Sequence, residues 1–144
     1  MIITDINKLR QKCIDVEPHE VDELRNLLQL ELEASEKRGH PGAGLAAPQI
    51  GIYKNMAIVR VKPIAIDLVN AKIIKSYGEF VFDGEGCLSF PGVFMKTKRF
   101  SEIVVTNNYH YSHSFIATGF TSIVIQHELD HLQGILLGDI TANT

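Results

Sequence analysis

Two histidines four residues apart, with a glutamate beside the first, are the residues whose types and spacing point most directly to chemistry. They stand in the run His127-Glu128-Leu129-Asp130-His131. Residues four apart lie on one face of a helix, so both imidazoles can bind a single ion, and neutral imidazole suits Zn²⁺ and Fe²⁺ alike. The Glu128 carboxylate can take a proton from a water on that ion and later return it. The run therefore predicts a hydrolytic metal centre rather than a chance pattern on a solvated helix.

A catalytic ion also needs a third protein ligand and an open position for water. The position six residues after His131, where one class of metalloproteases has its third histidine, is Leu137, and Asp139 comes directly after a glycine. We therefore expect the third ligand upstream. Cys87 is the preferred candidate because the glycines on either side of it let the backbone approach a ligand closely. The other candidates are Cys13, His19, His40, His110 and His113.

Each of these other candidates has a plainer interpretation. Cys13 reads as a small buried apolar residue, His110 and His113 as a solvated pair in a turn, and His19 and His40 as residues at the ends of a helix. A thiolate and two neutral imidazoles would leave a divalent ion with one net positive charge, and a water bound there loses its proton readily. A closed structural site is the alternative, but no fourth ligand has motif-like spacing.

Two helices and several strands must position these residues. Residues 19–37 lack Gly and Pro and carry an apolar stripe, which predicts an amphipathic helix after Pro18 and before Gly39. Residues 119–134 predict a second helix, capped by Thr118, stopped by Gly134 and apolar enough on all sides to be buried. The Gly/Ala/Pro-rich segment 42–51 is expected to be too kinked for a core strand. Strands are expected at 56–61, 64–69, 80–82 and 103–106, with a turn at 110–114 leading into a short strand through Ile116.

This order predicts an α+β fold in which antiparallel sheets pack around a central helix, with a further helix near the N-terminus. The 144 residues, 45% apolar and 22% charged, suffice for one core, so we expect a single catalytic domain over residues 1–144. The net charge of −3 and the lack of a basic run argue against nucleic-acid recognition. No apolar run is long enough to span a membrane, the N-terminus is not a secretory signal, and two cysteines cannot form a disulfide scaffold. A monomer in a reducing cytoplasm is the expectation.

Three segments together resemble the three signature motifs of peptide deformylases. They are Gly42-Ala43-Gly44-Leu45-Ala46-Ala47-Pro48-Gln49, Glu85-Gly86-Cys87-Leu88-Ser89 and Gln126-His127-Glu128-Leu129-Asp130-His131. Their order and approximate spacing match as well, and the resemblance covers nearly the whole chain. It implies the peptide deformylase fold and a metal-dependent amidohydrolase that removes the N-formyl group from the initiator methionine of nascent bacterial-type polypeptides, releasing formate.

The resemblance also implies the roles of single residues. Cys87, His127 and His131 would be the metal ligands and Glu128 the general acid and base. The Gln49 side-chain amide and the backbone N–H of Leu88 would donate to the developing oxyanion. The ion would usually be Fe²⁺, with Zn²⁺, Ni²⁺ or Co²⁺ able to occupy the site.

The resemblance further implies where the protein acts. It would work in the cytoplasm of a bacterial or phage-infected bacterial cell, or be derived from an organelle. Its contact with the ribosome would be transient.

An extended peptide could pair with the Gly/Ala-rich segment as an added strand, with Gly44 the best candidate for contact. The methionine side chain needs an apolar pocket near the motifs, although Ile123 and Val124 would serve equally well as core residues. The candidate substrate-binding residues are Ala43, Gly44, Gly86, Phe90, Ile123 and Val124, with His127 beside them.

The chain departs from the family pattern in three places. Bacterial members often have an arginine seven residues after the motif cysteine, where this chain has Phe94. Lys96, Lys98 or Arg99 could substitute for the contacts of that arginine with the substrate backbone. The usual Asn-Pro before the second motif is Asn70-Ala71, and the chain stops soon after the metal helix. We also expect Asp130 to form a salt bridge with Arg99.

Three other functions remain open at this point. The first is a metalloprotease or another amidase, which the HExxH run alone does not separate from a deformylase. The second is a metal-binding or peptide-binding module without catalysis. The third is a metal that only stabilises the fold. The absence of a downstream third ligand and the presence of the Glu85–Ser89 segment favour deformylation over the first.

Overall fold

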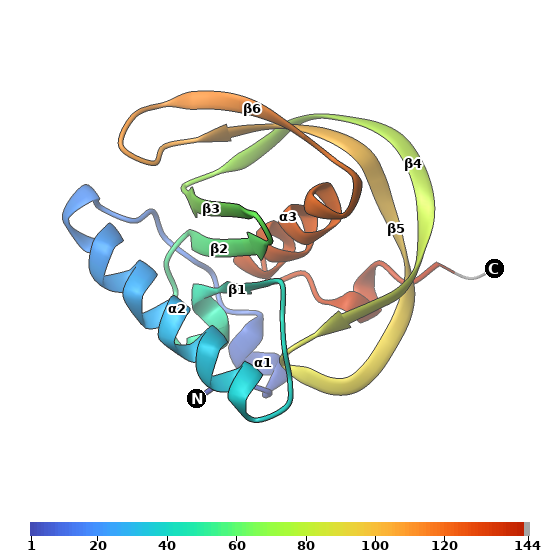
Figure 1. Cartoon of the computed structure of the whole chain (residues 1–144), viewed down its shortest axis with the longest axis horizontal. Helices are drawn as coiled ribbons and strands as arrows, with labels where there is room; N and C mark the ends of the chain where they lie inside the picture. Colours follow the sequence, from blue (N-terminus) through green and yellow to red (C-terminus); the bar gives the residue numbers. More distant parts are fainter. Residues whose placement is uncertain (143–144) are drawn as a thin grey trace.

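The computed structural model describes residues 1–142, whose strands form two antiparallel sheets (Figure 1). The first sheet has the order β1-β2-β3 and the second the order β4-β5-β6. The strands are β1 Gly44–Ala46, β2 Met56–Val61, β3 Ile64–Val69, β4 Lys72–Cys87, β5 Phe90–Asn107 and β6 His113–Thr118. The predicted α+β class with antiparallel sheets is confirmed.

Helix α3 (Gly119–Leu132) lies between the two sheets, as the apolar character of its first half predicts (Figure 1). Ten of its fourteen residues are buried, so its polar side chains must find partners or ligands inside the protein. Thr118 occupies the N-cap position, and Gly134 follows the helix with a φ of +74°, a conformation that favours glycine. The expected helix is thus confirmed, but it ends at Leu132 rather than at residue 134, and the Thr118 side chain makes no capping hydrogen bond. Its HExxH run faces the interior.

Helix α2 (Val21–Lys37) covers the other face of the first sheet. Its buried leucines Leu24, Leu28 and Leu32 recur every four residues and pack against Met56 and Ile58 of β2. The alternate residues of β2, Ala57 and Val59, point the opposite way and pack with α3. Sheet β1-β2-β3 is therefore buried on both faces, and the predicted amphipathic helix is confirmed with a start two residues later than 19. The short helix α1 (Ile6–Leu9) precedes it and was not predicted.

The expectation that segment 42–51 contains no core strand is wrong. Gly44–Ala46 is a fully buried strand, β1, that pairs with β2 in the register Gly44↔Val59 to Ala46↔Ala57. The physical reason is tertiary: a Cβ on residue 44 would lie only 2.8 Å from the carbonyl oxygen of Ile58, so the absent side chain is what admits the strand. The chain then turns through a short 3₁₀ segment, Ala47–Ile50.

Strands β4 and β5 are far longer than the predicted runs 80–82 and 103–106, which are parts of them. The two strands pair from Lys72↔Thr106 to Cys87↔Phe90 and curve around α3 (Figure 1). Most of β4 is exposed, so its length leaves little hydrophobic alternation in the sequence. Register shifts between Phe82 and Glu85 and between Gly86 and Cys87 interrupt the pattern further. The strand expected after the 110–114 turn is β6, which extends to Thr118.

Within residues 1–142 we find no helix with the length and apolar character needed to cross a membrane.

Candidate metal centre

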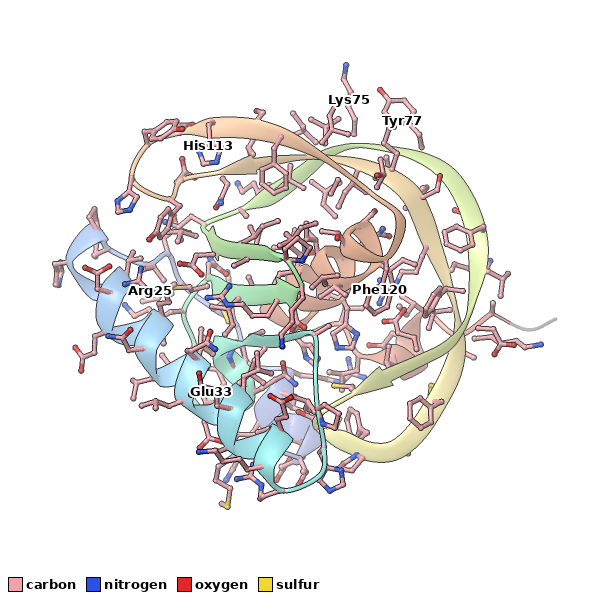
Figure 2. The ribbon with its side chains drawn as sticks, in the orientation of Figure 1. Arg25, Glu33, Lys75, Tyr77, His113 and Phe120 are labelled. Atoms are coloured by element: carbon pink, nitrogen blue, oxygen red, sulfur yellow. The ribbon has the colours of Figure 1, made fainter. Side chains whose placement is uncertain are left out.

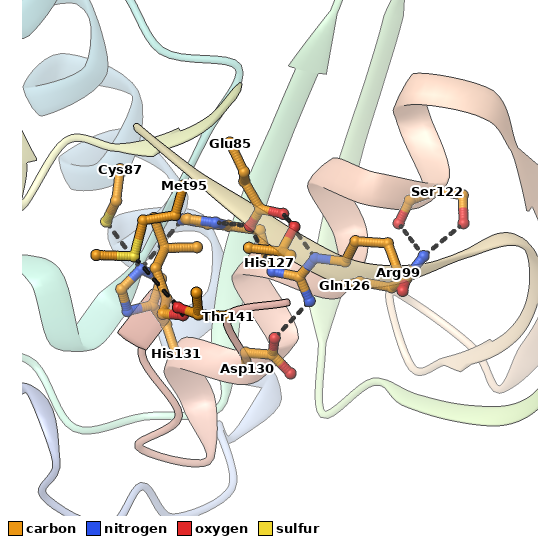
Figure 3. Close-up of polar contacts among 12 residues, drawn as sticks. Glu85, Cys87, Met95, Arg99, Ser122, Gln126, His127, Asp130, His131 and Thr141 are labelled. Carbon is orange, nitrogen blue, oxygen red and sulfur yellow. Dashed lines mark hydrogen bonds and ion pairs between the residues drawn. The ribbon is translucent and has the colours of Figure 1, made fainter. Parts of the chain in front are cut away.

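Three side chains from two elements converge on one point, as Figure 3 shows. Helix α3 places Nε2 of His127 3.2 Å from Nε2 of His131, and Sγ of Cys87, at the end of β4, lies 3.2 Å from Nε2 of His131. All three donor atoms lie within 4.8 Å of one another. A tetrahedral ion with metal–ligand bonds of about 2.0–2.3 Å holds its ligand atoms roughly 3.3–3.6 Å apart. The donor set and its spacing therefore fit one divalent transition-metal ion.

The other candidate ligands do not join this cluster among the residues that the structure describes. Cys13 is a buried core residue, as expected, and burial raises the pKa of its thiol to about 11. His113 is the first residue of β6, and its Nδ1 lies 3.0 Å from the carbonyl oxygen of Tyr111. Cys87 is thus the upstream side chain that the fold brings to the histidine pair.

Glu85 fixes the orientation of the His127 ring, a role that the sequence did not reveal. Its Oε2 lies 2.8 Å from Nδ1 of His127, so a proton on Nδ1 leaves the Nε2 lone pair free for an ion (Figure 3). Burial alone would raise the pKa of Glu85, but donors from Arg99, His127 and Thr97 outweigh it and lower the pKa to about 2. The Glu85 carboxylate is therefore charged at neutral pH and can accept a hydrogen bond from Nδ1 of His127.

Arg99 joins Glu85 to the metal helix. Its Nε donates to Oε1 of Glu85 at 2.7 Å, a second nitrogen pairs with Oε2, and Nη1 lies 2.6 Å from Oδ2 of Asp130. The expected salt bridge between Asp130 and Arg99 is confirmed. The side chain is only 3% exposed, so Arg99 cannot take over substrate contacts at the protein surface, and that suggestion is wrong. Lys96 and Lys98 lie at exposed positions of β5 and do not line the cavity beside the cluster.

Replacing Arg99 with leucine is expected to destabilise the protein by about 3–5 kcal/mol, because the carboxylates of Glu85 and Asp130 lose their buried partner. Urea unfolding followed by circular dichroism measures this change. The matched control is Arg38→Leu, whose guanidinium is half exposed and lies 3.8 Å from Glu31. That variant should lose less than about 1 kcal/mol. Equal losses in the two variants would contradict a special role for the buried network.

Glu128 lies beside the three donor atoms and faces β1. A Cβ on residue 44 would come within 2.7 Å of its Oε2, which shows how closely Gly44 approaches the carboxylate. Its Oε1 and Nδ1 of His131 are buried with no hydrogen-bond partner among residues 1–142. Burial is the main reason that the pKa of Glu128 is raised to about 7, a value suited to both taking and giving a proton near neutral pH.

Gln49 presents its amide to the same place. Its Oε1 accepts the N–H of Ala46 at 3.0 Å, which orients the amide so that Nε2 donates to Oγ of Ser89 at 3.1 Å and lies 3.6 Å from Sγ of Cys87. Ser89, in the turn between β4 and β5, was not predicted to contribute. Leu88, in the same turn, packs against Gly42, where a Cβ would meet its side chain at 2.7 Å.

A cavity of about 400 Å³ opens next to the cluster. The structure places every residue predicted to bind substrate in its wall, together with Gln49, Cys87, Leu88, His127 and Glu128. The predicted wall residues are Ala43, Gly44, Gly86, Phe90, Ile123 and Val124. Ile123 and Val124 are also almost fully buried, so the expectation that they could serve the core is compatible with their place in the wall. The strands β1 and β4, the β4–β5 turn and helix α3 thus surround one pocket.

The polypeptide deformylase family model matches residues 2–144 of this chain. The peptide deformylase of Heliobacterium modesticaldum is 44% identical over 104 residues, which are 71% of this chain and 68% of that protein. Peptide deformylase 2 of Clostridium acetobutylicum is 37% identical over 134 residues, 92% of this chain and 87% of that protein. The crystal structure of the Thermotoga maritima peptide deformylase superposes with a TM-score of 0.86 at 28% identity, covering 99% of this chain and 97% of the other. A probable peptide deformylase from Synechococcus phage S-SSM7 gives a TM-score of 0.83 at 35% identity, covering 97% and 98%.

Proposed function

The chain belongs to the polypeptide deformylase family, which removes the N-formyl group from nascent peptides, and on that premise we propose how its own residues divide the reaction. Cys87, His127 and His131 hold the metal ion. The observation that carries this assignment is the convergence of their three donor atoms within 4.8 Å, from two elements far apart in sequence. Oε1 of Glu128 supports it, because this atom is buried with no hydrogen-bond partner among residues 1–142 and buried polar atoms ordinarily have partners.

The family is metal-dependent, and Fe²⁺ is the ion we propose for the cell, with Zn²⁺, Ni²⁺ or Co²⁺ able to replace it. A bound ion supplies Lewis acidity, which lowers the pKa of water and polarises the formyl carbonyl. One thiolate and two imidazoles are ligands that both Fe²⁺ and Zn²⁺ accept, so the choice needs measurement. Metal analysis after anaerobic purification, coupled to formate release, tests the proposal because air could oxidise an iron–thiolate centre.

Glu128 carries the proton. Its carboxylate accepts a proton from the attacking water as the water oxygen bonds to the formyl carbon. When the carbon–nitrogen bond breaks, the protonated carboxyl gives that proton to the departing amine, so the products are formate and a free amino terminus. The buried position of Glu128 and its pKa near neutrality support both halves of this transfer.

Gln49 and the backbone N–H of Leu88 stabilise the oxyanion that forms on the formyl carbon. The bond from Ala46 to the Gln49 carbonyl keeps the amide donor turned toward Cys87 before substrate arrives, so no reorganisation is needed during the reaction. The amide is also held at its nitrogen, because Nε2 of Gln49 donates to the hydroxyl of Ser89.

Replacing Gln49 with leucine is expected to lower kcat by about 10²–10³-fold with little change in bound metal, because one aimed donor is lost. Steady-state formate release with formyl-Met-Ala-Ser, alongside metal analysis, checks this result. The control Gln11→Leu changes the same side chain at an exposed position and should keep the parent rate. A Gln49→Leu enzyme within threefold of the parent would remove Gln49 from the oxyanion site.

The peptide substrate binds as an extended strand along β1. In the described part of the chain β1 pairs only with β2, and Gly44 at its start lines the cavity next to Glu128. The methionine side chain then enters the cavity between Ile123, Val124 and His127.

We propose that residues 1–144 form one catalytic domain that acts as a monomer in the cytoplasm and meets its substrates in transient contact with the ribosome.

A comparison of three substrates tests the function. Metal-loaded protein should release formate from formyl-Met-Ala-Ser, should leave acetyl-Met-Ala-Ser essentially intact, and should cleave no internal peptide bond. Cleavage of internal bonds would favour a metalloprotease, and equal turnover of the acetyl peptide a broader amidase. Failure to release formate with a full complement of metal would contradict the proposed function.

A further inference from the structure

A buried hydroxyl on β5 contacts the carboxylate that orients one of the metal ligands. Thr97 is 0% exposed, and its Oγ1 donates to Oε1 of Glu85 at 2.7 Å. Its side chain does not line the cavity, so it has no contact with a substrate bound there. Resting on the proposed function, we propose that Thr97 is a positioning residue of the metal centre, whose hydroxyl holds the Glu85 carboxylate in the orientation in which His127 retains the ion.

Both carboxylate oxygens of Glu85 are occupied, each by two donors. Oε1 accepts hydrogen bonds from Thr97 and from Nε of Arg99, both at 2.7 Å. Oε2 pairs with a second nitrogen of Arg99 and lies 2.8 Å from Nδ1 of His127. Rotation of the carboxylate would move Oε2 away from Nδ1 and release the His127 ring from the orientation that presents Nε2 to an ion. Thr97 opposes this rotation because it holds the other oxygen.

Arg99 is a less rigid support than Thr97 for the same carboxylate. It reaches Glu85 through a long side chain, and its Nη1 lies at the same time 2.6 Å from Oδ2 of Asp130 on α3. Threonine is branched at Cβ and has few χ1 conformations, so its hydroxyl loses little freedom when it forms a hydrogen bond. A short donor fixed to the strand therefore adds rigidity that the shared arginine does not supply.

The backbone of Thr97 is paired on both sides, which fixes the position of its hydroxyl. On one side Thr97 lies opposite Phe82 of β4. On the other side it forms an antiparallel bridge with Thr141, near the C-terminal end of the described chain. Two backbone hydrogen bonds, of 2.8 and 3.2 Å, join residues 96–98 to residues 140–142 around that bridge. The donor to Glu85 is thus anchored in the middle of a three-stranded arrangement.

A β-bulge in β4 brings Glu85 to the same face of the sheet as Thr97. The register passes from Phe82↔Thr97 to Glu85↔Met95, so β4 has one residue more than β5 between these pairs. Met95 and Thr97 are two residues apart and share a face, as do residues directly opposite each other. Without the extra residue Glu85 would point to the other face, from which Tyr77 reaches outward (Figure 2). The bulge therefore brings this carboxylate to this hydroxyl.

The test measures the rate at which the metal-loaded protein releases Zn²⁺ to an excess of chelator. Thr97→Val keeps the shape of the side chain without its hydroxyl and should release the ion about three- to tenfold faster than the parent. Loss of a group that orients a metal-binding histidine typically costs about 10–100-fold in metal affinity, and the effect here is smaller because Arg99 still holds Glu85. Thr97→Ser retains the hydroxyl and should release the ion within about twofold of the parent rate.

Two further measurements separate positioning from a general loss of stability. The visible absorption bands of bound Co²⁺ report the geometry of its ligands, and they should change in Thr97→Val but not in Thr97→Ser. With the ion kept saturating, kcat for formyl-Met-Ala-Ser should fall in Thr97→Val while KM stays at the parent value, because Thr97 lies outside the cavity wall. Thermal melting shows that each variant folds, and Thr97→Ala is a second variant without the hydroxyl.

The matched control is Thr106→Val near the end of the same strand, where the hydroxyl lies 3.4 Å from the carbonyl oxygen of Lys72. This variant should release Zn²⁺ at the parent rate. Parent-like release and Co²⁺ spectra in both Thr97→Val and Thr97→Ala, or equal acceleration in Thr97→Ser or Thr106→Val, would overturn the inference while leaving deformylation intact. Failure of the parent to bind an ion would overturn the inference together with the metal assignment, whereas failure to release formate with the ion bound would overturn the proposed function alone.

Discussion

Glu128→Gln is expected to lower kcat/KM for formyl-Met-Ala-Ser by about 10²–10⁴-fold while the protein keeps its metal. The amide has nearly the shape of the carboxylate and still fits against Gly44, but it cannot accept a proton from water or return one to the amine. Because Glu128 is not one of the three converging donors, the ion should bind with its parent stoichiometry. Formate release and metal analysis on the same preparation separate the two effects.

The matched control for this change is Glu23→Gln on the exposed surface of α2, which alters charge by the same amount far from the cavity. It should keep the parent rate. The neutral amide also removes a buried group whose charged form burial disfavours, so Glu128→Gln should be at least as stable as the parent. Full activity in Glu128→Gln would show that another group carries the proton, whereas loss of metal would show that Glu128 helps to hold the ion.

Cys87→Ala should lose both the metal and the activity. Removing the thiolate leaves two imidazoles, and a catalytic ion in a protein ordinarily has three protein ligands. Purified variant protein should contain much less than one equivalent of iron or zinc after dialysis, and formate release should fall to background. Inductively coupled plasma spectrometry gives the metal content directly.

Cys13→Ala provides the control, because Cys13 is the other cysteine of the chain. Its thiol is buried, and burial raises its pKa to about 11, so it exists almost entirely as the neutral thiol at neutral pH and is a poor metal ligand. This variant should keep its metal and its activity. A Cys87→Ala protein that binds one equivalent of ion and releases formate would remove Cys87 from the site and with it the proposed coordination.

The sequence was informative wherever a local rule decides the outcome. Spacing of four on a helix places His127 and His131 side by side in any helix, and the run of apolar residues before them already requires burial of α3. The stripe of leucines in α2 and the short apolar runs of β2 and β3 are likewise visible without coordinates. The choice of Cys87 over the other upstream candidates was weaker, since it depended on neighbouring glycines and on the resemblance.

Other features depend on contacts between residues that lie far apart in the sequence. Glu85 precedes Cys87 by two residues, but only the pairing of β4 with β5 brings Thr97 and Arg99 to its carboxylate. The full length of β4 is hidden because most of its residues are exposed and its register shifts break the alternation. The wall of the cavity arises in the same way, because Phe94 of β5 and Phe120 of α3 line it together.

By itself the sequence determined the kind of chemistry. The spacing of the HExxH run and the apolar pattern around it depend only on residues close together in the chain, so they act in the same way in any fold that contains this helix. Only the tertiary structure decided which sulfur completes the site, which carboxylate orients His127 and why Gly44 forms a buried strand. Those outcomes depend on the distance between atoms of different elements, and a distance of 3.2 Å between Cys87 and His131 is set by how the β4–β5 ribbon curves around α3. The spacing of residues along the sequence does not determine that curvature.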